Sequence, residues 1–152
     1  MAKKIKLVIR SSDEYRLIAV VSHLKDYKLA FEINQNLGLD LVRYDDLAYA
    51  VSGDIMCTYA WYRFEDSSSH AVFYLIGSKH QGGNLIPSAK SADFFMLIKN
   101  HPDPQEIKQF LAKLRTIPNV ITAVEVKPDT VKDIDMLLDI NELHEMEQLN
   151  HR

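Results

Sequence analysis

Two stretches of the chain follow the same order of strand, helix and strand, and this order restricts the fold more than any other sequence feature. In the first stretch, Tyr15 to Val21 is almost entirely apolar, which is typical of a central strand covered on both faces. From Asp26 the apolar residues recur at helical spacing, and Gly38 occupies a position where a left-handed residue ends a helix. Leu39–Arg43 then predicts a short strand.

The second stretch begins with the apolar run Asp93–Lys99, which predicts another strand. Asp103 and Pro104 occupy the positions of a helix N-cap and a first helical residue, and Glu106 completes the spacing of a capping box. Val120–Val126 alternates between apolar and polar residues, as a half-buried strand does. Each stretch is therefore a strand-helix-strand unit of about thirty residues.

The segments around these units predict further strands and one more helix. Lys4–Arg10 alternates between basic and apolar residues, which predicts a strand at an edge or with one face in water. Met56–Glu65 and Ala71–Ile76 are rich in aromatic and β-branched residues and predict a hairpin. Tyr44–Asp54 has no clear period and predicts a loop or a short helix. Apolar residues at helical spacing after Pro128 predict a last helix.

Together these elements predict an α+β protein with a mainly antiparallel sheet and helices packed on one face. The plan is ferredoxin-like, a split βαβ arrangement with the aromatic hairpin inserted between its halves. The opposite face then needs a cover, which the hairpin, the last helix or a second copy of the chain can supply. We expect one α+β domain over residues 1–140 and a C-terminal tail, frayed or docked as a helix, over residues 141–152.

Composition and charge set several classes of function aside. The chain has 152 residues and a net charge of −3, whereas a general nucleic-acid binder needs a concentrated positive surface. No run approaches the ~20 apolar residues of a membrane helix, and no signal-peptide pattern is present. We therefore expect a cytoplasmic protein without nucleic-acid or membrane partners. A single cysteine, Cys57, and six scattered histidines give no metal-ligand spacing, so we predict no metal and no cofactor.

A short motif lies just before the apolar run of the second unit. Ile86-Pro87-Ser88, three intervening residues and then Ala92-Asp93-Phe94 resembles the signature of the IPExxxVDY family, a set of bacterial proteins grouped by this motif. The resemblance covers about Tyr15 to Val126. It singles out four signature positions, which are Ile86, Pro87, Asp93 and Phe94.

This chain departs from the family pattern at three positions of the motif. The family's Glu is Ser88, its Val is Ala92 and its Tyr is Phe94, so a carboxylate and a phenol are missing. Pro87 fixes an extended turn, and we expect the Asp93 carboxylate to accept backbone N–H bonds from that turn. This structural role is favoured over a catalytic one.

A second candidate site lies where the first long strand ends and its helix begins. Exposed N–H groups at a helix start favour an anion, and a histidine there can carry a proton. The candidate ligand-binding residues are Ser22, His23, Lys25, Asp26 and Tyr27. The alternative is that Ser22 or Asp26 simply caps the helix.

The sequence favours a non-catalytic module that binds a protein partner or a second copy of itself, forming a homodimer. The aromatic segment exceeds the needs of one small core, which suggests an exposed apolar surface. Its candidate interface residues are Tyr59, Trp61, Tyr62 and Phe64. One alternative is a sensor domain for a small ligand, an amino acid or an anion, and an enzyme is the third choice. A cleft that holds His23 together with Asp93 favours the enzyme.

Overall fold

The computed structural model describes residues 15–50, 55–100 and 103–150 of the chain, and it shows an α+β fold. Its main element is a six-stranded sheet with the order β2-β5-β6-β7-β1-β8, in which every neighbouring pair is antiparallel. The expected strand Lys4–Arg10 lies outside the described residues. The strands of the sheet are β1 (Tyr15–Ser22), β2 (Val42–Arg43), β5 (Trp61–Glu65), β6 (Val72–Gly77), β7 (Phe94–Lys99) and β8 (Val120–Val126).

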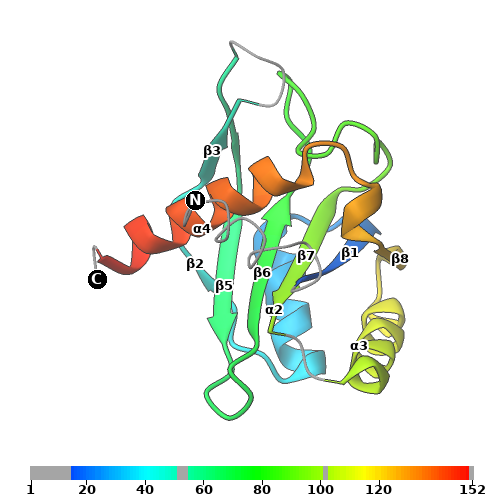
Figure 1. Cartoon of the computed structure of the whole chain (residues 1–152). Helices are drawn as coiled ribbons and strands as arrows, with labels where there is room; N and C mark the ends of the chain where they lie inside the picture. Colours follow the sequence, from blue (N-terminus) through cyan, green and yellow to red (C-terminus); the bar gives the residue numbers. More distant parts are fainter. Residues whose placement is uncertain (1–14, 51–54, 101–102, 151–152) are drawn as a thin grey trace.

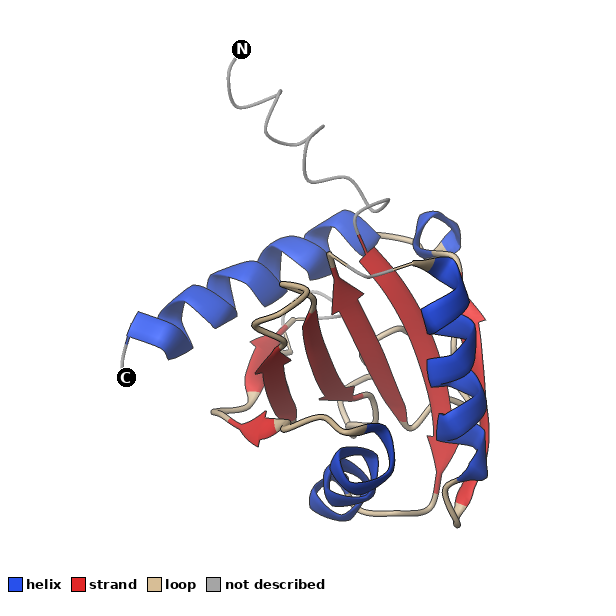
Figure 2. Ribbon diagram, turned by 90° about the horizontal axis from the view of Figure 1, so that it is seen from below, coloured by secondary structure: helices blue, strands red, loops and turns tan. Residues whose placement is uncertain are grey.

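Two helices cover one face of this sheet, as Figures 1 and 2 show. Helix α2 (Asp26–Leu37) follows β1 and ends at Gly38, whose φ of 72° is the left-handed conformation expected there. Helix α3 (Pro104–Thr116) joins β7 to β8, and its N-cap Asp103 accepts a hydrogen bond from the Gln105 N–H. The sequence-based predictions that Gly38 ends α2 and that Asp103 caps the start of α3 are therefore confirmed.

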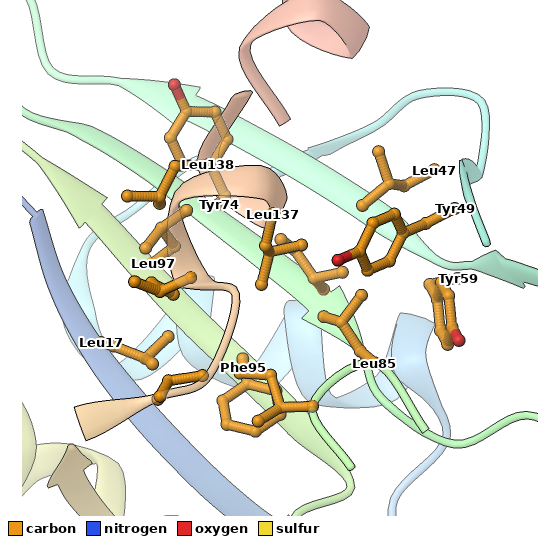
Figure 3. Close-up of a cluster of buried hydrophobic side chains, with 14 of the residues drawn as sticks. Leu17, Leu47, Tyr49, Tyr59, Tyr74, Leu85, Phe95, Leu97, Leu137 and Leu138 are labelled. Carbon is orange, nitrogen blue, oxygen red and sulfur yellow. The ribbon is translucent and has the colours of Figure 1, made fainter. Parts of the chain in front are cut away.

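A third helix, α4 (Ile134–Asn150), lies across the opposite face, where Figure 1 shows it in front of β5 and β6. It follows a short 3-10 turn, Pro128–Thr130, and continues past residue 140 without a break. Leu137 and Leu138 are buried against the sheet, as the close-up in Figure 3 shows. Of the three covers that the sequence left open for this face, the last helix is the one found, so helices pack on both faces of the sheet rather than on one.

The sheet separates two hydrophobic cores because successive side chains of a strand point to opposite faces. In β1, Leu17 lies in the core under α4, whereas Ile18 lies in the core under α2 and α3. Phe94 to Ile98 of β7 are buried without interruption. An uninterrupted apolar strand is the pattern of a sheet covered on both faces, and both covers come from this chain.

The aromatic segment divides into strands of two different sheets. Strand β5 pairs with β6, which confirms the expected hairpin. The residues before it form β4 (Cys57–Tyr59), which pairs with β3 (Leu47–Tyr49) in a separate two-stranded sheet. The expectation of a loop or short helix over Tyr44–Asp54 is therefore wrong at β3.

Burial of the aromatic residues removes the interface that the sequence suggested. Trp61 is fully buried, and Tyr59 and Tyr62 are 2% and 5% exposed. Phe64 is half-buried and stacks on Phe73, with ring centroids 6.1 Å apart. Side chains that are already packed inside one copy of the chain cannot pair with a second copy, so this interface prediction does not fit the structure.

Polar contacts anchor α4 to the aromatic strands. The Trp61 Nε1–H donates to Asn141 Oδ1 at 2.8 Å. Glu145 Oε2 accepts from Arg63 Nε at 2.5 Å and from the Tyr74 hydroxyl at 2.9 Å. The Arg63 and Glu145 side chains are only 11% and 13% exposed, so the ion pair is largely shielded from water.

Candidate ligand-binding cleft

The ends of three neighbouring strands and the start of α2 form an open cleft of about 430 Å³. The register of the sheet aligns Val20 of β1 with Phe94 of β7, and Phe94 with Gly77 of β6. Ser22 and His23 after β1, Ser78 after β6 and Asp93 before β7 therefore meet at one end of these strands, although they lie far apart in the sequence. The lining residues are Ser22, His23, Leu24, Asp26, Thr58, Tyr59, Ala60, Gly77, Ser78, Lys79, Asp93 and Phe94.

Asp93 links β7 to the end of β1. Its Oδ2 accepts a hydrogen bond from the Ser22 N–H at 2.9 Å, and its own N–H donates to the Val20 carbonyl. The expected bonds from the Ile86-Pro87 turn to this carboxylate are not among those of the described residues. Asp93 therefore contacts the strand-helix junction rather than the turn, and its structural role stays a prediction.

Helix α2 begins without a side-chain cap. Its N-cap is Lys25, which forms no capping hydrogen bond through its side chain. Ser22 Oγ instead donates to the Asn119 carbonyl and accepts from the Leu24 N–H. Asp26 Oδ2 accepts from Arg43 Nη1 at 2.6 Å and from the Tyr62 hydroxyl at 2.8 Å. The capping alternative for Ser22 and Asp26 is therefore wrong, and Asp26 ties α2 to the sheet.

Ser78 is the residue of the cleft that best indicates a ligand. It is fully buried, and its Oγ has no hydrogen-bond partner among the described residues. A buried hydroxyl without a partner costs about 1–3 kcal/mol, so native proteins rarely keep one without a reason. Because Ser78 is 0% exposed, a ligand satisfies this hydroxyl only where it displaces the atoms that cover it.

The cleft carries charges of both signs. Lys79 and His23 supply a cation and an exposed imidazole, and Asp26 and Asp93 supply carboxylates. The Lys79 ammonium donates to the Lys90 carbonyl, which places the charge at the loop between β6 and β7. Both carboxylates already accept hydrogen bonds from the protein. The cleft therefore offers groups of both charges to a small polar molecule.

The structure brings together part of each sequence-predicted site. Ser22, His23 and Asp26 of the strand-helix junction line the same cleft as Asp93 and Phe94 of the signature. Lys25 and Tyr27, which were also predicted, are exposed and do not line it. The sequence missed Ser78 and Lys79, whose proximity depends on the pairing of β6 with β7.

The other half of the signature lies elsewhere. Ile86 is buried in the core under α4, and Pro87 is exposed. Both residues line a second, separate pocket beside the start of α4. The motif therefore spans two sites, with its Ile-Pro turn at one and its Asp-Phe pair at the other.

The described residues contain no group of three or more His, Cys, Asp or Glu side chains arranged to hold a metal ion. Within the same part of the chain, none of the helices has the length and apolar character needed to cross a membrane. No protein-family model matches the chain, and neither does any curated protein.

Proposed function

We propose that this protein is a non-catalytic binding module that holds a small polar ligand of the amino-acid class in the cleft between β1, β6, β7 and α2. The observation that carries the proposal is the fully buried Ser78 hydroxyl, which lines the cleft and has no partner among the described residues. The cleft volume of about 430 Å³ lies within the ~300–1,000 Å³ range of small-molecule sites.

The mixed charges of the cleft support a zwitterionic ligand over a simple anion. Lys79, the His23 imidazole and the first N–H groups of α2 attract a carboxylate. The carboxylates of Asp26 and Asp93 disfavour a multiply charged anion and accept an ammonium group. An α-amino acid carries both groups a short distance apart.

An enzyme remains the third choice, although His23 and Asp93 line one cleft as that reading requires. The hydrogen bond from Ser22 N–H to Asp93 Oδ2 engages the carboxylate in holding the backbone. A carboxylate used in this way favours a structural role over proton transfer. We therefore place ligand binding ahead of catalysis. We also propose that the protein is cytoplasmic.

The finer description of the fold is part of the same proposal. Strands β8-β1-β7-β6 have the order of a ferredoxin-like sheet, in which α3 makes the split βαβ crossover around β1. On this view β2 and β5 are additions that extend the sheet, and β3-β4 is an insertion. The motif Ile86-Pro87 with Asp93-Phe94 supports membership of the bacterial IPExxxVDY family.

A thermal-shift experiment tests ligand binding. The wild type is heated with a panel of L-amino acids, short carboxylates and inorganic phosphate, each at millimolar concentration. A ligand at ~100 times its dissociation constant adds about 2.7 kcal/mol to the free energy of unfolding. We expect at least one amino acid to raise the midpoint, and we expect phosphate to have a smaller effect.

Single substitutions then locate the site. His23→Ala and Lys79→Ala should abolish the shift, because both residues line the cleft. Lys25→Ala is a matched control, since Lys25 is exposed, lies on the same loop and does not line the cleft. No response to any compound in the panel, or equal loss of the response in Lys25→Ala, would contradict the proposal.

Self-association is a second candidate function, supported by the outer face of α4. Four large apolar side chains on this helix are exposed, at 54%, 60%, 59% and 40% for Met136, Leu143, Met146 and Leu149. A contiguous exposed apolar face often marks a protein interface. We expect a homodimer in light scattering that becomes monomeric in Leu143→Glu. A monodisperse wild-type monomer at high concentration would refute this function.

A further inference from the structure

A second pocket of about 270 Å³ lies beside the start of α4 and shares no lining residue with the cleft. Its walls come from the Ile-Pro turn, from strand β3 and from the segment that leads into α4. The apolar side chains that line it are Leu85, Ile86, Val131, Ile134 and Leu137. All five are at least 91% buried, so the walls belong to the packed core rather than to a mobile surface.

Tyr49 places a polar group inside these apolar walls. The side chain is 6% exposed, and Figure 3 shows its hydroxyl directed toward Leu85 and Leu137. No hydrogen bond joins this hydroxyl to another described residue, and it is not among the fully buried side-chain atoms that lack a partner. The hydroxyl is therefore open to the pocket that Tyr49 lines. Burial raises the pKa of Tyr49, and the nearby Asp133 carboxylate raises it further. The phenol therefore stays protonated and can donate a hydrogen bond at neutral pH.

The start of α4 also lines the pocket, through Ile134 and Leu137. Helix α4 begins at Ile134, and the first N–H groups of a helix have no partners within that helix. These groups carry the positive end of the helix dipole. Lys132 and Asp133 also line the pocket and carry opposite charges. An apolar chamber with donors at one end fits a molecule with an apolar body and an oxygen acceptor at one end.

We propose that this pocket binds a small apolar carboxylic acid, with its aliphatic or aromatic body among Leu85, Ile86 and Leu137 and its carboxylate at Tyr49 and the start of α4. The site is separate from the cleft and does not depend on a ligand there. It also gives the Ile86-Pro87 half of the signature a function of its own, because these residues form one wall. The compact volume favours a body of about the size of hexanoate or phenylacetate.

NMR titration of the full-length protein with hexanoate and phenylacetate tests the proposal, with hexylamine and phenethylamine as matched cations. The carboxylates should shift the amide signals of residues 131–137 and of Tyr49, and the amines should not. Tyr49→Phe keeps the aromatic ring and removes the donor, so it should weaken binding about tenfold, as expected for a hydrogen bond to a charged group. Lys132→Ala changes an exposed residue and should weaken carboxylate binding while the protein stays folded.

Variants of the cleft between β1, β6, β7 and α2 show whether hexanoate binds in the second pocket rather than in that cleft. His23→Ala and Lys79→Ala should bind hexanoate as tightly as the wild type does, whatever their effect on amino acids. The proposal is overturned if neither carboxylate shifts these signals at 50 mM, a concentration on the order of ten times a weak millimolar dissociation constant. It is also overturned if the amines bind equally well, or if Tyr49→Phe and Lys132→Ala both leave the hexanoate affinity unchanged.

Discussion

Replacing Glu145 with Ala should destabilise the protein strongly, because this residue anchors α4 to the sheet through two buried partners. Its Oε2 accepts from Arg63 Nε at 2.5 Å and from the Tyr74 hydroxyl at 2.9 Å. The substitution leaves the Arg63 guanidinium, which is 11% exposed, with the more exposed Glu65 as its remaining counter-ion among the described residues. It also leaves the buried Tyr74 hydroxyl without its acceptor.

Breaking one partner of a buried ion pair costs about 3–5 kcal/mol, which is a large part of the ~5–15 kcal/mol that stabilises a typical domain. Equilibrium urea unfolding, followed by the fluorescence of Trp61, measures this loss. Trp61 donates to Asn141 on the same helix, so its emission reports the docking of α4. Glu147→Ala is the matched control, because Glu147 is exposed on the same helix and should change the free energy by less than ~0.5 kcal/mol. A loss below ~1 kcal/mol in Glu145→Ala would falsify the reasoning.

Two further substitutions test other contacts of the fold. Asp93→Ala removes the acceptor of the Ser22 N–H and should lower the free energy of unfolding by about 1–3 kcal/mol in urea, with the exposed Asp129→Ala as control. If the free energy of unfolding is unchanged in Asp93→Ala, the Asp93 carboxylate is better explained by ligand binding. Burial, reinforced by the hydrogen bond to Asp26, raises the pKa of Tyr62 to about 12, so the folded state keeps a proton that the unfolded state loses above pH ~10. Stability should therefore fall between pH ~10 and ~12, and it should fall less steeply in Tyr62→Phe; equal slopes would contradict this linkage.

Local signals in the sequence predicted the elements whose ends are fixed by single residues. Asp103 caps α3 and Gly38 ends α2, and both effects depend on a few neighbouring backbone groups. The period of two predicted β8, and the apolar runs predicted β1 and β7. Strand β3 was missed because three residues are too few to show a period, and its pairing with β4 decides its conformation.

Properties that depend on packing between distant segments were not predictable. The aromatic residues exceed the needs of a single core, and the sequence does not show that α4 covers them and forms a second one. Trp61 is buried under a helix eighty residues away in the sequence, through its contact with Asn141. The excess of aromatic residues therefore builds a second core inside one chain rather than an interface.

Some residues of the candidate cleft were predictable from local sequence signals, and others were not. Ser22, His23 and Asp26 were predicted because a strand end followed by a helix start is visible in the sequence. Ser78 and Lys79 join them only because Gly77 pairs with Phe94, a register that the sequence does not reveal. The residue that most strongly indicates a ligand was therefore outside the predicted set.

Substitution of Ser78 by Ala, measured with and without ligand, tests the binding function most directly. The change removes a buried hydroxyl that has no partner among the described residues. If the hydroxyl is retained to bind a ligand, the ligand-free variant should unfold at the same or a higher temperature than the wild type. The same variant should lose most of the stabilisation that amino acids give to the wild type. A variant that is destabilised without ligand, or that keeps the full ligand-induced shift, would contradict the account.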